Sequence, residues 1–186
     1  MVVNGILTFP GDARNWAGRA TTWMLSRGIA AQEFPHFVGP LGRTLRQADL
    51  ASKLAKRVHH FAVAGFEVSF IAHSNGANVV LGALKLLGYP RIGKLELLSP
   101  ACPADCDDSC INKVNAESIT VHVGGKDWAL MLAGLPTGKW LGFGTLGRDG
   151  PQDANVPIVT RRVDAYGHSD WFTDEHFEET MLAVVV

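Results

Sequence analysis

The sequence lacks an excess of charge of either sign, and it lacks a long apolar run. Lys and Arg number 17, and Asp and Glu number 18, among the 186 residues, so the net charge is −1. Such a balance gives no reason to expect a nucleic-acid partner or an anionic membrane surface. A transmembrane helix needs about 20 predominantly apolar residues, and no stretch of the chain approaches that length. We therefore expect neither nucleic-acid binding nor a transmembrane segment.

Cysteine is scarce and confined to one segment, which holds Cys102, Cys106 and Cys110. This odd number leaves at least one thiol unpaired in a monomer, while a disulfide between two of the three stays open. Zinc sites usually combine such a cluster with further Cys or His ligands elsewhere, and the sequence has no second cluster. We therefore expect no metal, and the role of the thiols stays open.

The first residues lack a basic leader. Residues 1–7 are mostly apolar and typical of a β-strand rather than a signal peptide, which favours a cytoplasmic protein. The hydrophobic fraction of 47% and the charged fraction of 19% are ordinary for a globular protein. A chain of this length is sufficient for one domain with a substantial core, so we expect a single domain over residues 1–186.

Strand and helix patterns alternate along the chain with short connections, which is typical of an α/β protein with a mostly parallel sheet and helices on both faces. The expected strands cover residues 2–9, 30–37, 66–72, 92–98, 118–123 and 158–166. The expected helices cover residues 13–26, a segment between a Thr44 cap and Gly65, residues 77–87, and a C-terminal segment capped by Thr173. Residues 134–157 are Gly-rich and aperiodic, which fits either a mobile flap or a packed loop.

A serine flanked by small residues follows the apolar strand that ends at Ala72. Ser74 lies between Ala72 and Gly76, and a helix-forming run begins at once. A sharp strand-to-helix turn holds a serine hydroxyl at its apex, and it needs small residues two positions before and after the serine because its backbone is crowded. The pattern therefore predicts a nucleophilic serine at position 74.

A serine nucleophile needs a base, and the base needs an orienting acid. Asp127 and His168 follow two later predicted strands, and the carboxyl ends of parallel strands meet at one edge of a sheet. We therefore expect Ser74, Asp127 and His168 to be the catalytic residues. Asp105 is the main rival for the acid, and His36 is the rival for the base.

The order serine, acid, histidine on this architecture resembles the α/β-hydrolase superfamily, in particular small lidless esterases or lipases. The resemblance implies a minimal α/β-hydrolase fold of about six strands, without a large cap domain and without the family's first antiparallel hairpin. It also implies an oxyanion hole of backbone amides, from Asn75 and from Gly11 or Asp12. Ala72 departs from the family's Gly-x-Ser-x-Gly pattern, although a methyl group still fits.

Three tryptophans lie next to the expected catalytic loops. Trp16, Trp128 and Trp171 form the wall of an apolar acyl pocket, or they fill the core near the ends of the sheet. Both interpretations stay open at this point.

The expected function is hydrolysis of a carboxylic ester on a small-molecule acyl substrate, through an acyl-enzyme on Ser74 and without a cofactor. This is the activity of a carboxylesterase or lipase. One alternative keeps the triad and changes the bond to a thioester, an amide or a carbohydrate-linked acetyl group. Another is a non-catalytic binding module on a hydrolase fold, because a fold alone does not determine its function.

Overall fold

A single parallel β-sheet forms the centre of the protein. The computed structural model describes residues 1–3, 15–34, 40–135 and 143–185. Within them six strands lie in the order β2-β1-β3-β4-β5-β6, and every neighbouring pair is parallel. The strands are β1 (Val2–Val3), β2 (Glu33–Phe34), β3 (Phe70–His73), β4 (Ile92–Leu98), β5 (Ala116–Gly124) and β6 (Val159–Val163). The expectation of an α/β protein with a parallel sheet of six strands is confirmed.

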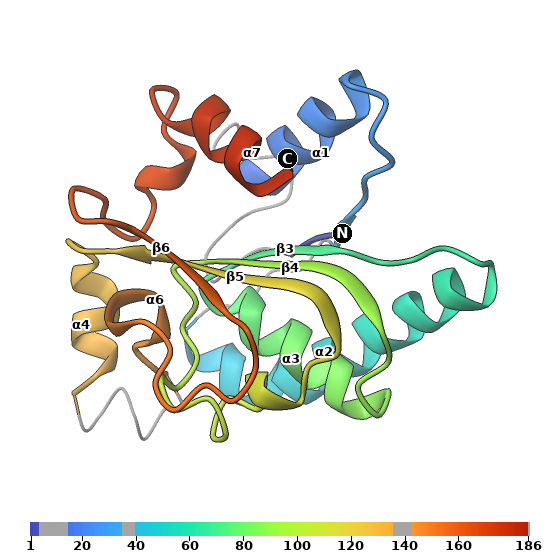
Figure 1. Ribbon diagram of the computed structural model, residues 1–186, viewed down its shortest axis with the longest axis horizontal. Coiled ribbons are helices and arrows are strands. Elements are labelled where there is room, and N and C mark those ends of the chain that lie inside the picture. The colour runs from blue at the N-terminus through green and yellow to red at the C-terminus, as the bar shows by residue number, and fades with distance from the viewer. Residues whose placement is uncertain (4–14, 35–39, 136–142, 186) are drawn as a thin grey trace.

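Helices cover both faces of this sheet (Figure 1). The helices α1 (Trp16–Ser26) and α7 (Phe177–Val185) lie on one face, and α2 (Pro40–Val63) and α3 (Gly76–Leu86) lie on the other. The short helices α4 (Trp128–Ala133) and α6 (Leu146–Asp149) lie at one end of the sheet, and η1 (Ile111–Lys113) and η2 (Asp170–Phe172) are single turns of 3₁₀ helix. No helix among the described residues is long and apolar enough to cross a membrane.

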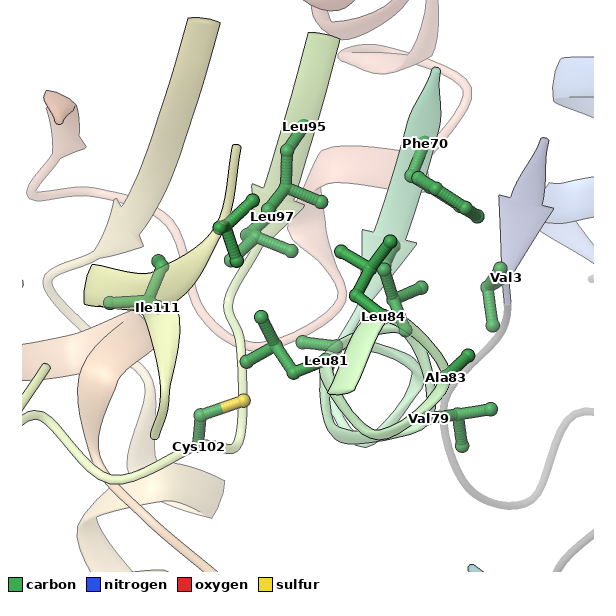
Figure 2. Packing of buried hydrophobic residues seen from close by; sticks show 14 of the residues in the cluster. Val3, Phe70, Val79, Leu81, Ala83, Leu84, Leu95, Leu97, Cys102 and Ile111 are labelled. Carbon is green, nitrogen blue, oxygen red and sulfur yellow. The ribbon is translucent and has the colours of Figure 1, made fainter. Parts of the chain in front are cut away.

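Two apolar cores result, one on each face, because side chains alternate along a strand. Figure 2 shows Phe70, Leu95 and Leu97 of the sheet beside Leu81 and Leu84 of α3. The opposite core contains the strand residues Val2, Ile71 and Leu98 together with side chains of α1, η2 and α7. The strand β3 contributes to both cores: Phe70 and Ala72 face α3, while Ile71 and His73 face α1.

Two expected helix caps are wrong. The helix α2 begins at Pro40, so Thr44 lies inside the helix rather than at its start. Proline suits a first helical position because its missing N–H would have no partner there. The helix α7 begins at Phe177, because Asp170–Phe172 forms a 3₁₀ turn whose Asp170 carbonyl accepts the Thr173 hydroxyl at 3.0 Å. Thr173 therefore closes η2 instead of capping α7 directly.

Other boundaries differ by a few residues. The strand β3 starts at Phe70 rather than at residue 66, and β6 covers Val159–Val163 within the expected 158–166. Gly65, which was expected to end a helix, and Gly88, which follows the expected helix 77–87, have φ of +84° and +72°, the left-handed conformation of a helix C-cap. The expected strand and helix residues 4–9, 13–14 and 35–37 lie outside the described ranges.

Stability depends on the core between the sheet and α3. Leu95 is fully buried on β4, whereas Leu86 at the end of α3 is 62% exposed. We expect Leu95→Ala to lower the free energy of unfolding by about 2–5 kcal/mol through lost burial and a residual cavity. The matched change Leu86→Ala should alter it by less than about 0.5 kcal/mol. Urea unfolding followed by circular dichroism measures both, and similar losses for the two variants would contradict this description of the core.

Candidate active site

The turn between β3 and α3 holds Ser74 in a conformation that is unusual for a residue with a side chain. Its φ is +54°, in the left-handed region. The Ser74 amide donates to the Leu98 carbonyl at 3.0 Å, and the Ser74 carbonyl accepts from the amides of Ala77 at 3.2 Å and Ala101 at 3.1 Å. These bonds join the turn to the end of β4 and so maintain a strained backbone at the apex.

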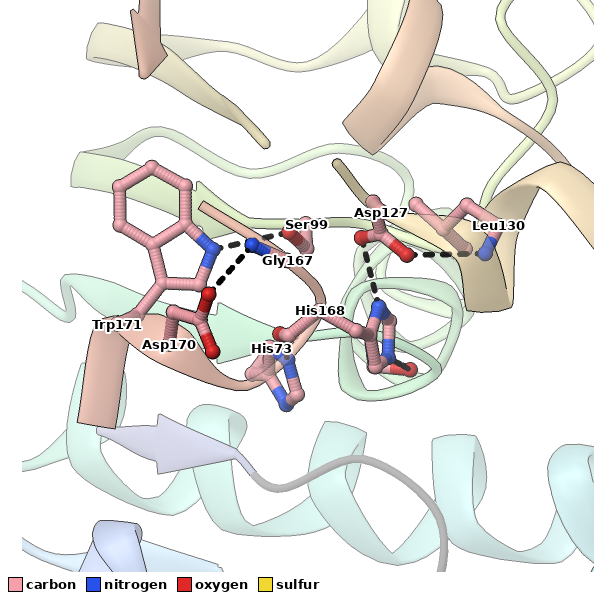
Figure 3. A network of polar contacts seen from close by, with 9 residues as sticks. His73, Ser99, Asp127, Leu130, Gly167, His168, Asp170 and Trp171 are labelled. Atoms are coloured by element: carbon pink, nitrogen blue, oxygen red, sulfur yellow. Dashed lines mark hydrogen bonds and ion pairs between the residues drawn. The ribbon is translucent and has the colours of Figure 1, made fainter. Parts of the chain in front are cut away.

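Ser74, His168 and Asp127 form a chain of hydrogen bonds, and Figure 3 shows the bond that joins His168 to Asp127. The Ser74 Oγ is 2.9 Å from the His168 Nε2, and the His168 Nδ1 is 2.8 Å from the Asp127 Oδ2. Because a carboxylate only accepts, the Nδ1 carries the proton and leaves the Nε2 free to accept from the serine hydroxyl. The structure thus brings together the three side chains that the sequence selects, from loops after β3, β5 and β6.

Asp127 is fixed on both of its carboxylate oxygens. The Oδ1 accepts the Leu130 amide at 2.9 Å as the N-cap of α4, while the Oδ2 faces the imidazole. The Asp127 side chain is fully buried, and that of His168 is 20% exposed. One carboxylate therefore both caps a helix and hydrogen-bonds to the imidazole of His168, which stays partly exposed.

The loop that carries His168 is held by two further side chains. The Gly167 amide donates to the Asp170 Oδ2 at 2.8 Å, which closes the turn around the histidine. The His73 Nε2–H donates to the His168 backbone carbonyl at 2.8 Å. Burial first, and then the neighbouring His168 ring, lower the pKa of His73 to about 3, although the bond to His168 and the charge of Asp127 oppose this change.

A second polar network lies in the sheet beneath the site. The His122 Nε2–H donates to the Glu96 Oε2 at 2.7 Å, and the Thr120 hydroxyl donates to the Glu96 Oε1 at 3.0 Å. The Trp171 indole packs on His122 at 5.7 Å between ring centroids and donates to the Ser99 Oγ at 2.9 Å. Sequence reasoning missed this network, although a glutamate within the apolar strand 92–98 is a signal that a buried partner exists.

The described part of the Gly-rich stretch packs against the loop after β4. The amides of Gly144, Leu146 and Gly147 donate to the carbonyls of Ala101, Cys102 and Pro100 at 2.9–3.1 Å. A Cβ on Gly144 would lie 2.0 Å from the Cys102 backbone, and one on Gly147 would lie 2.3 Å from the Ser99 backbone. Residues 143–150 are therefore a packed segment behind the site, while residues 136–142 lie outside the described ranges.

The other expected site residues are distributed as follows. Asn75 is buried directly after Ser74, whereas Gly11 and Asp12 lie outside the described residues, as does His36. The rival acid Asp105 does not pair with the histidine; its Oδ1 accepts the amides of Asp107 and Asp108.

Cys102, Cys106 and Cys110 form no disulfide with one another, and burial raises the pKa of the Cys106 thiol. No group of three or more His, Cys, Asp or Glu side chains within the described ranges is placed to hold a metal ion. Neither interpretation of the cysteine segment, as a metal site or as a disulfide, gains support from this arrangement.

The three tryptophans do not form one wall. Trp16 is buried in the core between the sheet and α1, where it stacks on Phe172 at 4.1 Å between ring centroids. Trp171 is buried in the same core, whereas Trp128 is 66% exposed at the start of α4. Only Trp128 presents its side chain at the surface next to Asp127.

No protein-family model matches the chain, and no curated protein is significantly similar to it in sequence. The geometry of the site is therefore what bears on function.

The depressed pKa of His73 makes stability depend on pH. In the unfolded chain His73 gains a proton below about pH 6.5, while the folded protein keeps it neutral down to about pH 3. Because the unfolded state binds more protons in this window, the contribution to stability is present above about pH 6.5 and is lost as the pH falls toward 3. Between about pH 7 and pH 5 the wild type should lose about 2 kcal/mol more than His73→Gln.

Urea unfolding at both pH values measures this difference. All other titrating groups are common to the two proteins, so their contributions cancel in the comparison. Equal losses for the wild type and His73→Gln would show that His73 titrates normally in the folded state.

Proposed function

We propose that the chain is a serine hydrolase with a minimal α/β-hydrolase fold, and that it cleaves carboxylic esters through an acyl-enzyme intermediate. The observation that carries the proposal is the unbroken chain of hydrogen bonds from Ser74 through His168 to Asp127. A serine hydroxyl is a weak nucleophile at neutral pH, and a hydrogen-bonded imidazole oriented by a buried carboxylate is the arrangement that activates it.

In the first step the Ser74 Oγ attacks the carbonyl carbon of the ester, and the His168 Nε2 takes the hydroxyl proton. The imidazolium that forms is stabilised by the ionised Asp127, which lies 2.8 Å from the Nδ1. The tetrahedral intermediate then collapses, and His168 returns the proton to the departing alcohol. The same residue next takes a proton from water as the water oxygen attacks the acyl carbon. When the second tetrahedral intermediate collapses, the acid leaves and His168 returns the proton to the Ser74 Oγ.

The negative charge of the tetrahedral oxygen needs donors that are already in place. Asn75 is 1% exposed at the N-terminus of α3, and none of the described residues accepts a hydrogen bond from its amide. That amide and the positive end of the α3 dipole are suited to the oxyanion. The resemblance places the second donor at Gly11 or Asp12.

Apolar side chains next to the site favour an ester with an apolar portion. Trp128, Met131, Leu132 and Leu135 directly follow Asp127 and are each 47–66% exposed. Their spacing of three and four residues places Trp128, Met131 and Leu132 on one face of α4. An exposed apolar surface of this kind, beside an acid that orients the base, favours an apolar acyl or alkyl group over a charged substrate.

Replacement of the nucleophile tests the proposal. We expect Ser74→Ala to lower kcat for short p-nitrophenyl esters by about 10⁴-fold or more, because no other group forms the acyl-enzyme. A fluorophosphonate should label the wild type on Ser74, located by peptide mass mapping, and should not label the variant.

The result distinguishes the alternatives. A folded wild type that neither labels nor hydrolyses esters would favour the binding module. Rapid labelling of Ser74 without ester turnover would retain the triad and transfer the proposal to thioester, amide or carbohydrate-acetyl bonds. Substantial ester hydrolysis by Ser74→Ala would remove Ser74 from the mechanism.

Replacement of the acid gives a second test. Asp127→Asn keeps an oxygen that can accept the Leu130 amide, but it loses the negative charge. Its amide N–H also faces the His168 Nδ1, which donates in the wild type, so the imidazole tautomer with the proton on Nε2 is favoured. We expect kcat to fall by about 10⁴-fold with little change in KM. The control Asp105→Asn changes the rival carboxylate and should leave kcat within about twofold of the wild type. A larger loss in the control than in Asp127→Asn would assign the acid to Asp105.

A further inference from the structure

One buried histidine next to the site has no part in the proposed steps. His73 is the last residue of β3, directly before Ser74, and it is 7% exposed. Its ring lies edge-on to Trp16 at 6.0 Å and to Phe172 at 4.9 Å between centroids. Because Ser74 stands at the apex of the turn while His73 faces α1, the two side chains leave the end of the strand in different directions.

The polar atom of His73 contacts the backbone of the base rather than its ring. The His73 Nε2 lies 2.8 Å from the His168 carbonyl oxygen, and the two imidazole rings are 4.8 Å apart between centroids. A carbonyl only accepts hydrogen bonds, so the His73 Nε2 carries the proton and donates it. Figure 3 shows His73 beside His168, on the side away from Asp127.

We infer that His73 is a positioning residue, which holds the backbone of His168 at a fixed place relative to the nucleophile. The inference rests on the proposed function, since it assigns a role within the same site. Asp127 fixes the direction of the imidazole ring, but a ring is located only when its backbone is also fixed. His73 supplies that second constraint, and its peptide bond to Ser74 ties the base directly to the nucleophile.

The surroundings of His73 suit a neutral donor. Trp16 and Phe172 enclose the ring in apolar surface, which opposes a charge on it. The ionisable groups that act on it are His168 and Asp127. A positive charge on His73 would also oppose the imidazolium that forms on His168 during the reaction. A neutral histidine therefore supplies the hydrogen bond without competing for the proton that His168 must take.

Two substitutions separate the hydrogen bond from packing. His73→Phe keeps a ring between Trp16 and Phe172 but removes the donor, while His73→Gln keeps an N–H that reaches the same carbonyl. We expect His73→Phe to lower kcat by about 100-fold with KM within about twofold, since a displacement of about 1 Å at a reacting group costs this much. His73→Gln should recover kcat to within about tenfold of the wild type.

The double-mutant cycle with the base makes the test specific. In a His168→Ala background His73→Phe should have no further effect on the residual rate, because a residue that acts only through His168 loses its role when the imidazole is absent. The control Ile71→Val removes one methyl group two residues earlier on the same face of β3. It should lower stability modestly and leave kcat within about twofold of the wild type.

A readout independent of turnover keeps the two proposals distinguishable. The His168 Nδ1 proton, bonded to Asp127, should give a low-field NMR resonance in the wild type, in His73→Gln and in Ile71→Val. It should shift or broaden in folded His73→Phe. This result, in a protein that hydrolyses no ester and is not labelled by a fluorophosphonate, would retain the positioning role and refute the hydrolase. An unchanged His168 resonance in folded His73→Phe, or an equal loss of kcat in both His168 backgrounds, would overturn the inference.

Discussion

Two hydrogen bonds join the backbone of Ser74 to the loop end of β4: its amide donates to Leu98, and its carbonyl accepts from Ala101. These two bonds set the position of Ser74 relative to the side chains of Asp127 and His168. Because β3, β4, β5 and β6 are parallel neighbours, their carboxyl ends meet at one edge, where loops after β5 and β6 carry Asp127 and His168 to the serine. The side chain of Asn78 reinforces the attachment from α3, since it donates to the Ala101 carbonyl at 2.9 Å. The strained φ at Ser74 persists because the sheet and the helix fix both of its sides.

The end of the neighbouring strand β4 likewise combines a buried polar side chain with an unusual backbone conformation. Ser99, directly after β4, also has a positive φ, of +40°, and it is fully buried with its hydroxyl bonded to Trp171. The backbone of Gly147 approaches Ser99 so closely that any side chain at position 147 would collide with it. The edge that carries the candidate site thus combines buried polar groups with two residues of positive φ, Ser74 and Ser99, while the two apolar cores supply the stability that offsets them.

The sequence was sufficient to select Ser74, Asp127 and His168, because the small residues around the serine and the order of strand ends depend only on residue type and spacing. The sequence was not sufficient to predict the role inferred for His73. Its hydrogen-bond partner is a backbone carbonyl, which every residue has, so the residue types do not reveal the contact. Glu96 was visible as a charge inside a strand, but its partners follow only from the register that sets Glu96 opposite Thr120 and Leu98 opposite His122. The misplaced caps at Thr44 and Thr173 have a simpler cause: local capping patterns recur inside and between elements, and only the backbone decides which one is used.

His168 follows β6 in the chain, 94 residues from Ser74, so its proposed role as the base of Ser74 depends on where its loop is held. Asp127 restrains rotation of the His168 imidazole, and the loop on either side of His168 is held by the Lys126 amide, which donates to the Tyr166 carbonyl at 3.0 Å, and by the Trp171 indole, which donates to the Ser99 Oγ at 2.9 Å. Asp170 closes that loop on itself through Gly167, so it shapes the loop without placing it on the strand. Among the described residues, His73 is the side chain of β3 that hydrogen-bonds to this loop, and it lies directly before Ser74. Ser74 and the His168 carbonyl are then both tied to the end of β3, which favours the short distance of 2.9 Å between the Ser74 Oγ and the His168 Nε2.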